Sequence, residues 1–142
     1  MALKITRVQV WTAGMKDKPG GLAGKLAALA RAGASLEFIF ARRAAEQPGG
    51  GIVFLAPLKG ATQIRAAKAV GFESSKRIHT VRVAGPDKPG LAAKLTQKVA
   101  AAGLNLRGLS AMAVNKRGVM YLAVDSAAAA AAAARALKKR GR

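Results

Sequence analysis

The sequence contains no cysteine, few aromatic side chains and only six acidic residues. Without cysteine, the chain can form neither a disulfide framework nor a site that depends on a thiolate. Aromatic residues make up 4% of the 142 positions, and much of the 51% hydrophobic content is alanine. A core built on so much alanine is shallow, so we expect small modules that gain stability by packing against further copies.

Long apolar segments are also missing. No stretch approaches the roughly 18 consecutive apolar residues that suggest a membrane span. Residues 1–5 lead directly into an alternating strand pattern and lack the apolar core of a secretory signal. These features predict a soluble protein of the cytoplasm.

Positive charge is abundant, with 25 Lys and Arg residues and a formal net charge of +19. Such an excess favours adhesion to nucleic acid, because neutralised phosphates release counterions. The basic residues are nevertheless spread along the chain, and the densest cluster, residues 138–142, is expected to be a solvated end. The charge therefore predicts non-specific adhesion, and a nucleic acid is not the partner we expect.

A repeat organises the chain. Asp17-Lys18-Pro19-Gly20 recurs seventy positions later as Asp87-Lys88-Pro89-Gly90. Holding this offset gives nine identities over the twenty positions from Asp17 to Leu36, among them Gly33 and Gly103. Because a four-residue motif followed by a glycine at fixed spacing rarely recurs by chance, we interpret the chain as a duplication.

Hydrophobic periodicity predicts the elements of each copy. In the first copy Leu22, Leu26 and Leu29 form one apolar stripe of a helix that ends at Gly33. The predicted elements of the first copy are a strand at 4–12, this helix, a strand around 36–40, a strand at 52–55 and a helix at 61–70. Those of the second copy are a strand at 78–84, a helix at 90–102, strands at 105–114 and 119–124, and a helix at 126–138 that Ser126 caps.

This order predicts an α+β protein of two ferredoxin-like βαββα(β) modules, each an antiparallel sheet with helices on one face. We place the first module at residues 1–72 and the second at 73–142. The connection at 72–77 is too short for a flexible linker, so the modules are expected to be tightly coupled, by sharing or exchanging a strand. The second module lacks a closing strand after its last helix, and because an open sheet edge invites pairing, we expect a homodimer.

The repeated turn is the candidate site. A helix N-terminus presents unpaired N–H groups to a carboxylate, and glycine allows a ligand to approach the backbone closely. A neighbouring aspartate, Asp17 or Asp87, can balance a ligand ammonium, so the turn suits a free amino acid. The alternative is that aspartate caps the helix and Pro-Gly only makes the turn.

The strand–DKPG–helix–AG–strand pattern, present twice over nearly the whole chain, resembles the ACT domain. The resemblance is to tandem ACT proteins without a catalytic domain, which implies an amino-acid-binding regulatory protein that acts on a partner enzyme. It places ligand contacts in the turn before the first helix and at the residue that opens the second strand. In this sequence the implied contacts are Asp17, Pro19, Gly20, Gly21 and Ser35 in the first module and Asp87, Pro89, Gly90, Leu91 and Asn105 in the second.

Asn105 matches the residue common at the strand-opening position in that family, whereas Ser35 departs from it. In the second module we expect the ligand carboxylate on the backbone amides near Gly90 and Leu91. The ligand ammonium is expected to face Asp87 or Asn105.

The sequence offers no catalytic set. The single histidine, His79, lacks a second histidine or a cysteine for a metal site, and the carboxylates are too scattered for paired acid–base chemistry. We therefore expect no enzyme activity, no metal and no cofactor. Trp11 is expected to be a packing residue at the interface between sheets or subunits. The alternative function is non-specific nucleic-acid binding on the ferredoxin-like fold, for which Phe38, Phe40 and Phe54 could lie on a sheet; the second module offers only Tyr121.

Overall fold

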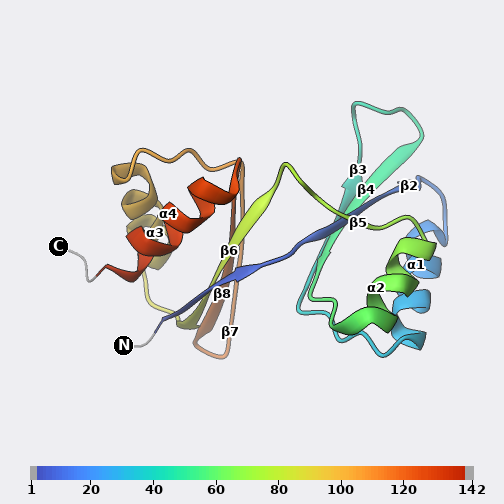
Figure 1. Ribbon diagram of the computed structural model, residues 1–142, viewed down its shortest axis with the longest axis horizontal. Coiled ribbons are helices and arrows are strands. Elements are labelled where there is room, and N and C mark those ends of the chain that lie inside the picture. Colours follow the sequence, from blue (N-terminus) through green and yellow to red (C-terminus); the bar gives the residue numbers. More distant parts are fainter. Residues whose placement is uncertain (1–2, 140–142) are drawn as a thin grey trace. The chain divides into compact units, whose positions relative to one another are not determined.

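The computed structural model describes residues 3–139, and within them the chain forms two compact units. The chain passes between the units twice, after Val8 and after Ser75. We call Gln9–Ser75 the N-unit and the rest of the described chain the C-unit. In the N-unit the elements are β2 (Trp11–Lys16), α1 (Gly21–Arg31), β3 (Phe38–Arg43), β4 (Gly50–Ala56), α2 (Gly60–Ala69) and β5 (Glu73–Ser74). In the C-unit they are β1 (Lys4–Val8), β6 (His79–Pro86), α3 (Leu91–Ala101), β7 (Gly108–Val114), β8 (Arg117–Val124) and α4 (Ala127–Lys138) (Figure 1).

The N-unit has an antiparallel sheet with the strand order β3-β4-β2-β5. Side chains alternate between the two faces of a strand, and one face packs against α1 and α2. Leu29 is almost fully buried there and Leu22 and Leu26 pack beside it, which confirms the predicted stripe. The buried cluster on this face consists of Trp11, Ala13, Leu29, Val53, Leu55, Ala67 and Phe72. The predicted packing role of Trp11 is therefore confirmed, but its predicted place is not: Trp11 lies in the core of the N-unit, on the sheet face that the helices cover.

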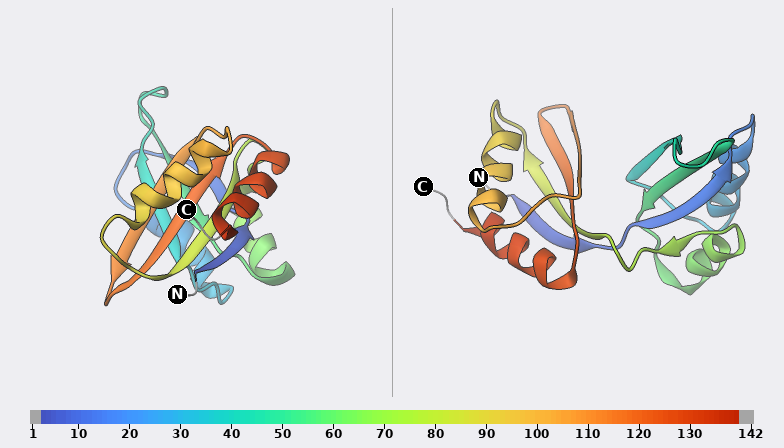
Figure 2. Two further views of the ribbon diagram at one scale, coloured as in Figure 1. Left: turned by 90° about the vertical axis from the view of Figure 1, so that its left-hand side faces the viewer. Right: turned by 90° about the horizontal axis from the view of Figure 1, so that it is seen from above.

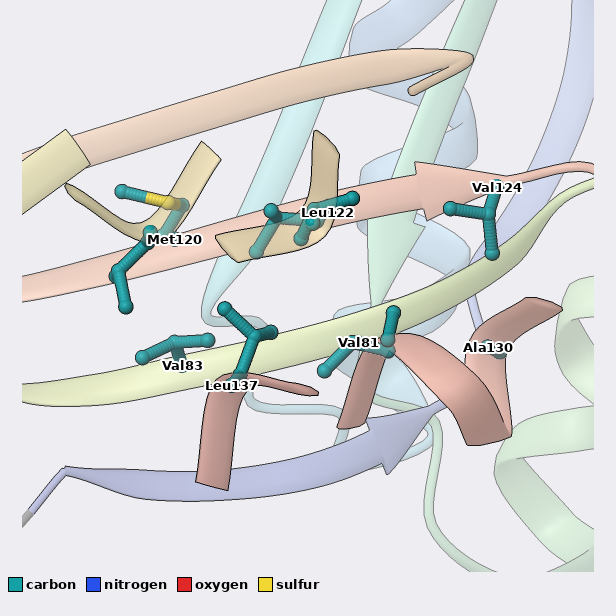
Figure 3. Packing of buried hydrophobic residues seen from close by; sticks show 10 residues of the cluster. Val81, Val83, Met120, Leu122, Val124, Ala130 and Leu137 are labelled. Atoms are coloured by element: carbon teal, nitrogen blue, oxygen red, sulfur yellow. The ribbon is translucent and has the colours of Figure 1, made fainter. Parts of the chain in front are cut away.

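The C-unit repeats this arrangement with the strand order β1-β6-β8-β7, and α3 and α4 lie on one side of the strands (Figure 2). Val81 and Val83 of β6 and Leu122 of β8 face Leu137 of α4 across the core (Figure 3). Small alanines such as Ala130 let α4 approach the sheet closely. Both units therefore have the predicted ferredoxin-like α+β arrangement, with an antiparallel sheet and helices on one face.

The N-terminal strand differs from its prediction. The sequence predicts one strand over residues 4–12, whereas the structure has β1 in the sheet of the C-unit and β2 in the sheet of the N-unit. Alternation continues through both segments because both are strands, so periodicity alone does not reveal that the chain changes sheet at Gln9.

β1 occupies the sheet edge that the sequence left open. It pairs antiparallel with β6, with Lys4 opposite Ala84 and Val8 opposite Thr80, at the position that β5 occupies beside β2 in the N-unit. The expected uncovered edge is thus closed from within the chain, and the expected strand exchange is present. The compact units consequently depart from the predicted modules 1–72 and 73–142, because the first strand lies with the second unit.

Local signals predict the helix ends well. Gly33 and Gly71 follow α1 and α2 with left-handed φ angles of 84° and 95°, a conformation that glycine adopts without strain. The Ser126 hydroxyl accepts a hydrogen bond from the Ala129 amide at 3.0 Å and caps α4, as predicted. Among the described residues no helix is long and apolar enough to cross a membrane. Residues 140–142 of the basic cluster lie outside the described part of the chain.

Replacing Ile5 with alanine should destabilise the C-unit by about 0.5–3 kcal/mol, because Ile5 packs against its core and the truncation removes buried apolar surface. Hydrogen exchange followed by mass spectrometry should become faster in β6 and β8 and stay unchanged in β2 and β4. Ile39→Ala is the control, since Ile39 lies on the N-unit sheet and is 46% exposed. If hydrogen exchange became equally faster in both units after Ile5→Ala, the assignment of β1 to the sheet of the C-unit would be contradicted.

Candidate functional site

The two repeated turns have one backbone conformation. Gly20 and Gly90 immediately precede α1 and α3, and each has a φ of 82°, in the left-handed region that favours glycine. The amide of the residue after each glycine donates a hydrogen bond to the carbonyl three residues before it. The Gly21 amide donates to the Lys18 carbonyl and the Leu91 amide to the Lys88 carbonyl, both at 3.1 Å. The DKPG motif thus builds a closed turn that ends where the helix starts.

The aspartates of these turns do not cap the helices. Glycine is the N-cap of both α1 and α3, and no side chain makes a cap hydrogen bond there. The aspartate backbones instead tie the turn to the neighbouring hairpin, through Asp17 N–H to Gly49 O at 3.0 Å and Asp87 N–H to Lys116 O at 2.8 Å. The alternative explanation of the motif as an aspartate cap is therefore wrong.

The two carboxylates have different partners. Asp17 Oδ2 lies 2.8 Å from Arg43 Nε, so its charge is balanced within the N-unit. Asp87 has no ion pair among the described residues, and its carboxylate lies beside Gly118. Of the two aspartates, Asp87 is the one whose charge remains available to a cation.

A cavity of about 170 Å³ lies next to Asp87, between the start of α3 and the sheet of the C-unit. Its wall is apolar apart from Asp87 and the backbone, and it extends to the edge strand β7. It is lined by Leu3, Val83, Gly85, Asp87, Leu91, Ala92, Leu95, Ala111, Met112, Ala113, Gly118, Val119 and Met120. One acidic group on an apolar chamber suits a ligand with one positive charge and an apolar side chain.

The corresponding hollow in the N-unit has the opposite charge. It has a volume of about 710 Å³ and is lined in part by Lys16, Lys18 and Lys25 together with Gly20 and Gly21. Lys25 donates to the Val70 carbonyl and its Nζ lies 5.9 Å from the centroid of the Phe72 ring, so its ammonium is already engaged. Identical motifs therefore stand beside chemically different surfaces.

At the start of α3, fewer backbone N–H groups are free to bind a ligand carboxylate than the sequence predicts. The Leu91 amide is used by Lys88, so in this conformation it does not receive a ligand carboxylate. Amides in the first turn of a helix have no acceptor within the helix, which leaves those of Ala92 and Ala93 pointing toward the helix start. Ala92 also lines the cavity.

The strand-opening residues lie far from the turns of their own units. Asn105 precedes β7 at the end of the sheet where Gly108 pairs with Ala123, whereas Asp87 follows Pro86 at the other end. Between the first and last of the eight residues of β6 there are seven steps of about 3.3 Å, which separate these ends by somewhat more than about 20 Å. Ser35 and Asp17 are separated in the same way, so neither unit brings its two sets of predicted contacts together.

The remaining candidates carry no site. His79 Nε2 lies 3.1 Å from the Lys76 carbonyl in the connection to β6. Among residues 3–139 no group of three or more His, Cys, Asp or Glu residues could hold a metal ion. Sequence reasoning missed the Asp17–Arg43 ion pair and the apolar cavity, because both depend on strand pairing that periodicity does not specify.

No protein-family model matches this sequence, and a comparison with curated proteins finds no match. Solved structures do match. The protein BT0572 from Bacteroides thetaiotaomicron aligns with a TM-score of 0.74 at 16% identity, over 95% of this chain and 99% of that one. The ligand-free regulatory subunit of aspartate kinase from Thermus thermophilus aligns with a TM-score of 0.65 at 21% identity, over 100% and 99% of the two chains.

The regulatory subunit of aspartate kinase from Thermus flavus aligns at 25% identity, with a TM-score of 0.59, over 96% of this chain and 93% of that one. These alignments run through both units. The chain therefore has the fold of the regulatory subunits of aspartate kinase, which confirms at the level of fold the resemblance to tandem ACT-domain proteins that its sequence indicates.

Proposed function

We propose that this chain is a non-catalytic regulatory protein that binds a free amino acid with an apolar side chain and transmits this binding to an enzyme of amino-acid metabolism. The observation that carries the proposal is the apolar cavity of the C-unit, with the carboxylate of Asp87, which has no ion pair within residues 3–139, on its wall beside the start of α3. The regulatory role is supported by the similar subunits of aspartate kinase.

Each part of an amino acid finds a complement at this place. The ligand ammonium faces Asp87, since a partly desolvated cation needs an opposite charge. Its carboxylate accepts from the amides of Ala92 and Ala93, where the helix dipole also favours negative charge. The side chain enters the cavity among Val83, Leu95 and Met120. Amino acids with charged side chains are disfavoured, because Asp87 is the one charged residue among the described residues that line this cavity.

A second copy of the chain completes the site in this proposal. β7 is an edge strand, and it exposes large apolar side chains on both of its faces: Leu109 at 45%, Met112 at 72% and Val114 at 61%. Apolar edges of this kind favour pairing with another strand. We therefore keep the homodimer as a proposal and place its axis at β7, since β1 closes the opposite edge.

Antiparallel pairing of two β7 strands about a two-fold axis places the start of one strand beside the end of the other. Asn105 lies just before the start of β7, and the cavity lies at its far end, where Met112 and Ala113 line it. The Asn105 side chain of one copy then reaches the cavity of the other. This arrangement joins the predicted contacts that one unit keeps roughly 20 Å apart.

A thermal-shift screen of the twenty amino acids should identify apolar ones such as valine, leucine, isoleucine or methionine as stabilising. A ligand that binds only the native state and is present at one hundred times its Kd adds about 2.7 kcal/mol to the free energy of unfolding.

Asp87→Asn should weaken the binding of the identified ligand by about 1–3 kcal/mol in calorimetry and leave the unliganded melting temperature unchanged. Asp17→Asn is the matched control, because Arg43 already neutralises Asp17. Loss of binding only in Asp17→Asn would place the site in the N-unit.

Mixing two defective variants tests the shared site. Asn105→Ala alone should cost about 1–3 kcal/mol of binding free energy, and Ser35→Ala, its counterpart in the N-unit, should cost nothing. After Asp87→Asn and Asn105→Ala subunits are mixed and allowed to exchange, each heterodimer should hold one site with native Asp87 and native Asn105. High-affinity binding should return at about one site per heterodimer. No recovery in a mixture that has demonstrably exchanged subunits would refute a site built from two copies.

A further inference from the structure

We propose that the open sheet face of the N-unit binds single-stranded nucleic acid by stacking bases on two neighbouring phenylalanines, the exposed Phe40 and the partly buried Phe54. Helices α1 and α2 cover the other face of this sheet, where Ala13, Val53 and Leu55 are buried. Residues alternate in direction along a strand, so Phe54 of β4 lies on the open face. Phe40 is directly opposite Phe54 in the β3–β4 pairing and lies on the same face.

These two rings form a stacked pair. Their centroids are 6.4 Å apart with an angle of 29° between the ring planes, and Phe40 is 45% exposed. Phe38, two residues before Phe40, lies on the same face opposite Ala56. Three of the four phenylalanines of the chain are thus placed outside the core, in a protein whose cores are made largely of valine, leucine and alanine. We call Phe38, Phe40 and Phe54 the aromatic platform.

The surroundings of the platform leave room for flat ligands. On β2 the open-face positions beside β4 are Thr12, opposite Phe54, and Gly14, opposite Ile52. A Cβ at Gly14 would meet one atom within 4 Å, the Gly51 carbonyl oxygen at 3.9 Å, so this glycine is not required by packing. Beside Phe54, this face of β2 thus carries one small side chain, Thr12, and at Gly14 no side chain.

Cations flank the platform on the same face. Arg42 follows Phe40 by two residues, opposite Ile52, and Lys16 follows Gly14 by two residues on β2. Arg42 lies 3.8 Å from Glu46 in an exposed pair, which is weak in water and can exchange for a phosphate. The net charge of +19 attracts a polyanion to the chain as a whole.

This combination fits a single strand better than the other candidates. Exposed aromatic rings with neighbouring cations stack successive bases without regard to sequence, whereas bases in a duplex are already stacked and shielded. A second copy of the chain is the competing occupant, since it could also bury Phe40. The basic residues of this face, Arg42 and Lys16, argue against self-association through it, because two copies of such a face repel each other.

The C-unit lacks this feature. The residue pair that corresponds to Phe40 and Phe54 in the strand register is Ser110 and Tyr121. The Tyr121 side chain is buried, with 5% of its surface exposed. The platform thus belongs to one half of a duplicated chain, separately from the amino-acid cavity in the other half. The inference stands whether or not that cavity binds an amino acid.

Fluorescence polarisation with a labelled oligouridylate of about twelve nucleotides tests the proposal. Phe40→Ala and Phe54→Ala should each weaken binding between about fivefold and about 150-fold, the effect of losing one base–aromatic stack. Ile39→Ala is the matched control, because Ile39 is 46% exposed on the opposite face of the same strand. It should bind the probe as the native chain does. The buried Trp11, in the core of the same unit, reports by its fluorescence whether each variant is folded.

Two further measurements separate stacking from charge and from self-association. Phe40→Leu keeps an apolar side chain without a π face, so it should lose affinity as Phe40→Ala does, whereas a hydrophobic contact with a second copy would tolerate it. The loss should persist as salt rises, while Arg42→Ala should lower the salt dependence by about one counterion. Equal binding by Phe40→Ala, Ile39→Ala and the native chain would overturn the proposal. The proposal would also be overturned if a substitution of Phe40 changed the oligomeric state seen in sedimentation and left binding of the oligouridylate unchanged.

Discussion

The pairing of β1 with β6 is the interaction on which the architecture depends. It gives the C-unit a fourth strand that its own contiguous sequence does not contain, and it places Leu3 and Ile5 against the core of that unit. Without it, β6 would be an edge strand and the buried Val81 and Val83 would lose a neighbour on one side. It also fixes which edge remains free, because with β1 in place the exposed apolar edge is β7.

The two copies of the duplicated segment share the backbone conformation of the turn but differ in the side chains that surround it. The turns at Gly20 and Gly90 have the same φ angle and the same closing hydrogen bond, so the conformation has survived in both copies. Around that constant backbone, Arg43 neutralises Asp17 and lysines line the neighbouring hollow. Asp87 lies beside an apolar cavity and has no ion pair in the part of the chain that the structure describes. The sheets have diverged as well, with paired phenylalanines in one and Ser110 with Tyr121 in the other.

Local rules account for what the sequence predicts correctly. The Leu22, Leu26 and Leu29 stripe, the glycine after α1 and the Ser126 cap each depend on a few neighbouring residues, and all are confirmed. The ferredoxin-like fold class follows from the order of such elements. What the sequence does not specify is pairing at a distance: the strand over 4–12 divides between two sheets because alternation is the same in both. For the same reason the motif predicts neither that Asp17 pairs with Arg43 nor that roughly 20 Å separate Asp87 from Asn105.

The crossing of the first strand also imposes an order of assembly during synthesis. The N-unit is one continuous segment, Gln9–Ser75, whose strands and helices can associate as soon as that segment has emerged. β1 is made before any of it, yet its partner β6 begins at His79, so Lys4 must wait for Ala84, eighty positions later. Closing so long a loop is slow compared with forming hairpins such as β7–β8. β1 precedes the N-unit in the chain and therefore becomes ordered only after β6 has been made, so the N-unit can fold while β1 is still unpaired.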